Sequence, residues 1–219
     1  MEKRLGRFSY GLMAVSAVGV ALWSLRYFGV PFGGRPPVDG GIAGVIAHIP
    51  FRALMHMLIA PIALLVGPFQ FIPSLRARHP KVHRYLGRAY VASCVIAGIA
   101  ALTVAPQASG GPVAGWGFGI LAMLWIATTL GGLWFALRRK FELHRLLMRL
   151  SYAMTFGAVT LRLQIPFGIM LGYTSYSEMS VWLAYTSWIP NVIVVLVYSA
   201  LEKTRRRGGA RSPLLAGLA

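Results

Sequence analysis

The sequence predicts an all-α, polytopic bundle of six transmembrane helices, and three observations predict it. Hydrophobic residues make up 57% of the 219 positions, whereas charged residues make up only 12%; a soluble domain normally has about 25% charged residues. Six apolar segments are each long enough for a span of about 20 residues, and Pro or Gly interrupts the first three connectors between them. Because no unpaired backbone group can face lipid, spans of this composition must be helices.

The six helices are expected at 9–29, 51–73, 86–105, 115–137, 147–171 and 180–201. The first follows a basic start that is similar to a signal peptide, but it is long for one and lacks an Ala-x-Ala cleavage site, so we predict an uncleaved span. The chain is interpreted as one integral membrane domain, 1–219, with a basic cytoplasmic tail at 202–219. Between the first two spans, residues 42–50 fit either an interfacial or a re-entrant segment.

Lys and Arg are distributed unequally between the two ends of these spans. One end has three in the N-terminus, five in 74–88, five in 138–149 and five in the tail, whereas the other end has Arg26, Arg35 and Arg52. The positive-inside rule therefore predicts a multi-pass protein of the bacterial inner membrane with both termini in the cytoplasm. The net charge of +17 mostly reflects this asymmetry and predicts contact with anionic lipids. Nucleic-acid binding is disfavoured because the cations flank spans instead of forming one soluble face.

A short phrase occurs twice, 61 residues apart, beginning at His83 and at His144. Each copy has Arg directly after the His, a second Arg four residues later, a Tyr close behind, and a basic run before it. The second and third helices, with their connector, therefore resemble the fourth and fifth, which suggests a tandem repeat of helical hairpins in parallel orientation. The alternative is that any membrane hairpin has a basic cytoplasmic turn.

Both histidines are expected at cytoplasmic starts of helices, where unpaired N–H groups and the helix dipole favour anions. Four arginines at similar depth complete a candidate cofactor site: Arg84, Arg88, Arg145 and Arg149. The anion would be a lipid phosphate, a quinone oxygen or the propionates of a haem. Two imidazoles on facing helices are also how membrane bundles ligate haem b, so His83 and His144 are candidate ligands of a haem iron. Alternatively, the arginines only contact lipid and set topology.

Three further polar residues are candidates for the same or a second site. Gln70, near the cytoplasmic end of the second helix, could face the two histidines. His56 lies in the outer part of that helix, and Arg162 lies near the middle of the fifth, where an Arg costs about 2.5–3.5 kcal/mol to insert. No acidic residue falls within a predicted span, and the single cysteine, Cys94, is expected in the core. Arg162 therefore indicates a polar cavity or an anionic ligand.

Together these residues resemble a bacterial family of predicted membrane proteins that is catalogued as a domain of unknown function, number twenty-three-oh-six. The resemblance covers about 50–170 and is carried by these residues: His56, Gly67-Pro68-Phe69-Gln70-Phe71, Leu75-Arg76, His83-Arg84, Gly87-Arg88, Tyr90, His144-Arg145, Met148-Arg149, Tyr152 and Arg162. It implies a multi-helix membrane protein and no particular activity.

Two hypotheses about function follow. The first is a haem b- or quinone-linked redox membrane protein whose His/Arg site lies on the cytoplasmic side. The second is a non-catalytic membrane subunit or small-molecule permease whose His/Arg cluster binds lipid phosphate. The first hypothesis implies a quinone or a redox protein as partner, whereas the sequence assigns no catalytic residue and no oligomeric state.

Overall fold

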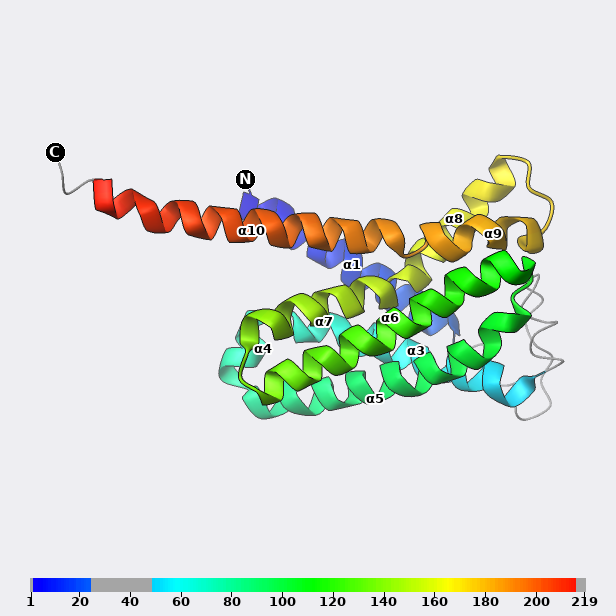
Figure 1. Cartoon of the computed structure of the whole chain (residues 1–219), viewed down its shortest axis with the longest axis horizontal. Helices are drawn as coiled ribbons and strands as arrows, with labels where there is room; N and C mark the ends of the chain where they lie inside the picture. The colour runs from blue at the N-terminus through cyan, green and yellow to red at the C-terminus, as the bar shows by residue number, and fades with distance from the viewer. Residues whose placement is uncertain (1, 25–48, 216–219) are drawn as a thin grey trace.

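The computed structural model describes residues 2–24 and 49–215, and within them every regular element is a helix (Figure 1). Helix α1 is Glu2–Ser24, α3 is Pro50–Gln70, α4 is Pro73–Arg78 and α5 is Pro80–Val104. The 3-10 turn η2, Ala105–Gln107, leads to α6, Gly111–Leu137. Helices α7, Phe141–Thr155, and α8, Gly157–Met170, are followed by α9, Tyr176–Thr186, and α10, Ile189–Leu215. This confirms the predicted all-α class and agrees with six helical rods in the described part.

Proline positions explain several helix starts, because a Pro in the first turn removes an N–H that would have no partner anyway. Pro50, Pro73 and Pro80 begin α3, α4 and α5. The α5 helix therefore begins six residues before the predicted start, and the short α4 was not predicted. Helix α9 begins differently, with Ser175 accepting a hydrogen bond from the Glu178 backbone N–H.

Two predicted spans are each broken into two helices, at Phe156 and at Ser187–Trp188. The breaks touch: a Cβ on Gly157 would lie 3.4 Å from the Ser187 carbonyl oxygen. The Asn191 amide donates to the carbonyl oxygens of Ala153 and Ser187, at 3.3 and 3.1 Å. The Asn191 side chain of α10 therefore links the backbone at the end of α7 to the backbone at the break between α9 and α10. Residues 202–215, predicted as a tail, continue α10.

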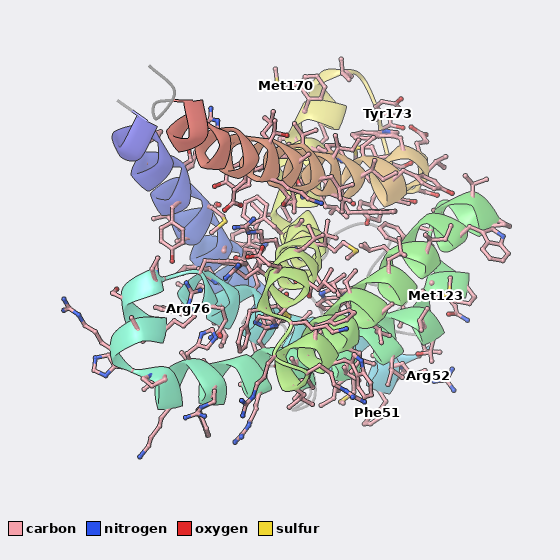
Figure 2. The ribbon with its side chains drawn as sticks, turned by 60° about the vertical axis from the view of Figure 1, so that its left-hand side comes forward. Phe51, Arg52, Arg76, Met123, Met170 and Tyr173 are labelled. Carbon is pink, nitrogen blue, oxygen red and sulfur yellow. The ribbon has the colours of Figure 1, made fainter. Side chains whose placement is uncertain are left out.

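The outer surface of the bundle is apolar. Within residues 2–24 and 49–215, five helical segments are long and apolar enough to cross a membrane, with mean hydropathies of 1.2–1.9, and Phe8–Ser24 is a shorter apolar helix. Large apolar side chains are exposed on several helices, among them Phe51, Met123 and Met170, which Figure 2 labels on the outside of the bundle. Such an extensive apolar exterior is typical of a protein embedded in a bilayer.

Helices α3, α5, α6 and α7 form the centre of the bundle, with α1 packed against α3 and α10 packed against α7 (Figure 1). Their core contains Tyr90, Trp125 and Tyr152 packed on small residues. Gly67 of α3 permits the closest approach, because a Cβ there would lie 2.1 Å from Cε2 of Tyr152 on α7. The α3–α5 and α6–α7 hairpins bring their connecting turns to the same end, which we call the basic end.

Candidate functional site

The basic end brings three of the predicted polar residues near one another. Gln70 lies in the last turn of α3, His83 in the first turn of α5 and His144 in the first turn of α7. His83 is within electrostatic reach of both His144 and Arg76; Arg76 is on α4, in the connecting turn of the first hairpin (Figure 2). The two histidines thus lie at the same end of the bundle, on different hairpins.

Two nitrogen atoms at this end are buried without a hydrogen-bond partner among the described residues. They are Nε2 of Gln70 and Nδ1 of His83. A Cβ added to Gly87, one turn beyond His83, would lie 3.3 Å from Oε1 of Gln70, so the amide lies directly against α5. Because leaving a buried polar group unpaired costs about 1–3 kcal/mol, these two atoms mark a site that is suited to a polar ligand.

His144 differs from His83 because a hydrogen bond to the backbone fixes the orientation of its ring. Its Nδ1 lies 2.8 Å from the carbonyl oxygen of Gly132 on α6. A carbonyl can only accept, so Nδ1 must carry the proton, and in the neutral ring Nε2 has the lone pair. This is the anchoring seen in histidines that bind a metal through the second nitrogen. Among the described residues, the buried Nδ1 of His83 has no such acceptor.

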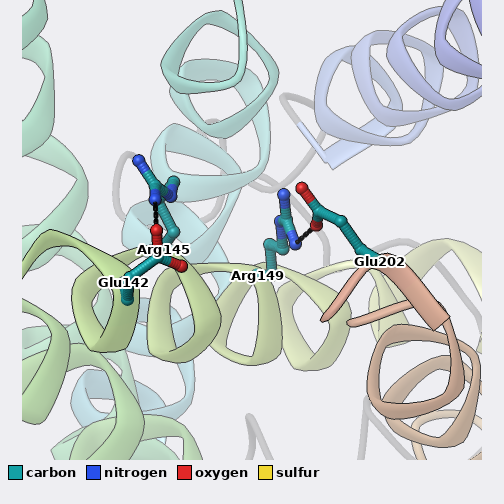
Figure 3. Close-up of polar contacts among 4 residues, drawn as sticks. All are labelled: Glu142, Arg145, Arg149 and Glu202. Carbon is teal, nitrogen blue, oxygen red and sulfur yellow. Dashed lines mark hydrogen bonds and ion pairs between the residues drawn. The ribbon is translucent and has the colours of Figure 1, made fainter. Parts of the chain in front are cut away.

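The four predicted arginines separate into two groups. Arg84 and Arg88 are exposed and, with Lys81 and Tyr85, line a hollow on the outer face of α5. Arg145 pairs with Glu142 on its own helix, and Arg149 pairs with Glu202 of α10 at 2.8 Å (Figure 3). Within the described residues, the Arg that lies within electrostatic reach of His83 is Arg76, which sequence analysis named only among the residues that carry the family resemblance.

His56 and Arg162 lie apart from the basic end but near each other. Nδ1 of His56, on α3, donates to the carbonyl oxygen of Ala97 on α5 at 3.0 Å, and the ring is within electrostatic reach of Arg162. Nη1 of Arg162, on α8, donates to the Ala158 carbonyl oxygen at 2.9 Å. A backbone carbonyl thus solvates the guanidinium, as expected for an Arg within a span. Most of 42–50, which was expected to be an interfacial or re-entrant segment, lies outside the described residues.

Sequence analysis missed a buried network of hydroxyl groups at the centre of the bundle. The Tyr90 hydroxyl lies 2.8 Å from Ser151 Oγ and 3.0 Å from Thr155 Oγ1. The Thr129 hydroxyl lies 2.7 Å from Ser151 Oγ and donates a hydrogen bond to the backbone carbonyl oxygen of Trp125. The indole N–H of Trp125 donates to Thr155 Oγ1. Thr155 also bonds the Ser151 carbonyl. Ser151 follows Tyr90 by the same 61 residues that separate the two histidines, but that offset marks equivalent positions and does not predict a contact.

The network has fewer protons than contacts. Four hydroxyls and one indole N–H supply five protons for six contacts, so one contact is without a proton at any moment. The Cys94 thiol lies against the same hydroxyls. Chemically, this network can rearrange its protons, and structurally it joins α5, α6 and α7.

The apolar exterior, the broken spans and the buried polar groups define a polytopic helical membrane protein. More specifically, the chain belongs to the DUF2306 family, described as "Predicted membrane protein", whose model matches residues 53–198. That range includes the hairpins α3–α5 and α6–α7 and the site at the basic end, and it confirms the resemblance noted from the residues. No curated protein and no solved structure matches the chain.

Proposed function

We propose that this membrane protein is quinone-linked and holds a quinone head group at the basic end. The observation that supports this most is the pair of buried, unpartnered nitrogens, Gln70 Nε2 and His83 Nδ1. Both can donate a hydrogen bond, and Arg76 adds a third donor nearby. A quinone presents two carbonyl oxygens as acceptors, and an apolar tail that belongs in the bilayer. Phe69, next to Gln70, is 48% exposed and offers an apolar surface to that tail.

A bound quinone would supply two-electron, two-proton chemistry. The role of the chain is to orient the head group and to hold protons beside it. His83 is suited to hold a proton at Nδ1, because a neutral ring can offer or accept one there. His144 and Arg76 set the electrostatic field at His83, and the Gly132 carbonyl fixes the His144 ring. Proton exchange at His83 would thus be tuned by its two basic neighbours.

The proposed location is the bacterial inner membrane, with the basic end and both termini in the cytoplasm. The support is the concentration of Lys and Arg in the connectors that form this end, together with the basic α10 extension. Cysteine accessibility tests it. A cysteine at position 79, in a Cys94→Ala background, should react with a membrane-impermeant maleimide in inverted vesicles and not in intact spheroplasts. Labelling in intact spheroplasts would contradict the orientation.

Quinone binding is tested with purified chain in detergent and a short-tail ubiquinone analogue. We expect His83→Ala and Gln70→Ala each to weaken binding about tenfold or more, since each loses hydrogen bonds from buried groups worth about 1.5 kcal/mol. His79→Ala is the matched control, because His79 is an exposed histidine of the same connecting turn. Equal affinities in all four proteins, or none in the wild type, would refute the proposal.

Haem b is the second candidate, and the anchored ring of His144 favours it. Against it, a ligating His83 would need a partner at Nδ1, which it lacks among the described residues. An absorbance spectrum separates the two ligands. A Soret band that disappears in the His83→Ala/His144→Ala double variant would support haem, whereas a colourless, folded preparation from haem-replete cells would exclude it and leave quinone binding untouched.

A further inference from the structure

The outer face of α5 carries a group of cations that the quinone proposal does not use. Lys81, Arg84 and Arg88 are spaced to lie on one face of the helix. With Val82 and Tyr85 they line a surface hollow of about 480 Å³. Within the described part of the chain none of the three cations forms an ion pair, and no carboxylate lines the hollow.

We propose that this hollow binds the phosphate of an anionic phospholipid. Charge complementarity is the first argument, because three unpaired cations converge where the helix leaves the bilayer. The second argument is the mixed lining: Val82 and Tyr85 are 44% and 73% exposed and offer an apolar surface to the glycerol and acyl region. Free phosphate would need only the cations, so the apolar half of the hollow favours a lipid.

The second hairpin provides an internal comparison. A hollow of about 540 Å³ lies at the α6–α7 turn and is lined by Arg139, Lys140 and Arg145, but also by Glu142. Arg145 is the counterpart of Arg84 at the 61-residue offset, and here it pairs with Glu142. The Glu142 carboxylate repels a phosphate, and its ion pair with Arg145 leaves that arginine less available to a lipid. Lipid selectivity should therefore reside on α5 and not at the equivalent place in the second hairpin.

Native mass spectrometry of the full chain in detergent, titrated with phosphatidylglycerol or phosphatidylcholine, tests the proposal. The variant K81Q/R84Q/R88Q removes three charges from α5, and R139Q/K140Q/R145Q removes three from the other turn. At roughly fivefold per cation, the α5 variant should lose about 100-fold in affinity for phosphatidylglycerol. The control should stay within about threefold, and phosphatidylcholine should bind all three proteins weakly and equally.

The outcomes separate the alternatives. Equal losses in both triple variants would mean that only net charge matters, and no loss in the α5 variant would place the lipid elsewhere; either result overturns the proposal. Displacement of the lipid by excess inorganic phosphate would identify a free-anion site and would also overturn it. If the α5 triple variant fails to fold, the single variant Arg84→Gln serves, with an expected loss of about fivefold.

Discussion

The two helical hairpins share a sequence phrase but satisfy its polar groups differently. In the second hairpin, His144 bonds the Gly132 carbonyl and Arg149 pairs with Glu202. In the first, Nδ1 of His83 is buried without a partner among the described residues, as is Nε2 of Gln70. The two copies of the phrase can therefore differ in role. In the second hairpin the polar groups are paired within the protein and stabilise the fold, whereas in the first hairpin hydrogen-bond donors are available for a ligand.

Packing between the helices of each hairpin differs in the same way. In α3–α5 the larger side chain, Gln70, is on the first helix and faces Gly87 on the second. In α6–α7 the glycine, Gly132, is on the first helix, and a Cβ there would lie 2.5 Å from Sδ of Met148 on the second. The contact that is polar in the first hairpin is apolar in the second. The comparison can be tested by variants, beginning with the largest expected effect.

Gly67→Ala should be the most damaging substitution, because Gly67 is where α3 of the first hairpin meets α7 of the second. Its Cβ would overlap the buried Tyr152 ring at 2.1 Å, and overpacking of this kind costs about 1–3 kcal/mol or more. We expect a large fall in the thermal unfolding temperature of the purified protein. Gly119→Ala, whose Cβ would be 3.8 Å from Ala105 Cβ, is the control; equal behaviour of the two would show that the hairpins are not packed as described.

Tyr90→Phe tests the hydroxyl bridge between the hairpins. Tyr90 contacts Ser151 and Thr155, but both hydroxyls have other partners. We therefore expect a loss of about 1–2 kcal/mol in the free energy of unfolding, measured by denaturant titration in detergent. Tyr85→Phe should change nothing, since Tyr85 is 73% exposed. An unchanged stability in Tyr90→Phe would mean that the network contributes no net stability.

Composition predicts the all-α membrane fold, because hydropathy acts over whole segments, but helix starts such as that of α5 at Pro80 are fixed by single residues. The breaks at Phe156 and Ser187 were not predictable, since they depend on Gly157 packing against another broken helix and on Asn191 bridging both. The sequence predicted that His83 and His144 lie at the same end of the bundle. It did not predict that two of the four arginines form ion pairs, Arg145 with Glu142 and Arg149 with Glu202. The sequence also did not identify Thr129 and Ser151 as members of a hydroxyl network. Hydroxyl side chains are common in helices, and only the tertiary contacts of these two distinguish them from the others.

Alanine substitution at the two histidines should affect the stability of the protein to different extents. His144→Ala removes a hydrogen bond to Gly132 and should cost about 0.5–1.5 kcal/mol. His83→Ala removes a buried nitrogen that has no partner among the described residues, so ligand-free protein should lose less stability or gain some. Quinone binding should show the reverse order, with His83→Ala the weaker binder. Chemical unfolding without ligand, beside the binding assay, measures both; equal stability losses would remove the distinction between the hairpins.

The smallest effect is expected from the Arg149–Glu202 ion pair, which links the second hairpin to α10. Both side chains are 27% exposed, and partly exposed pairs contribute about 0.3–1 kcal/mol. A double-mutant cycle with Arg149→Ala and Glu202→Ala should give a coupling energy in that range, and salt should weaken it. Arg88, the counterpart of Arg149 in the first hairpin, has no such pair in the described structure, so Arg88→Ala should leave stability unchanged. A coupling energy of zero would mean that the ion pair with α10 adds no stability to the second hairpin. Arg149 and Arg88 would then contribute equally little to the free energy of unfolding.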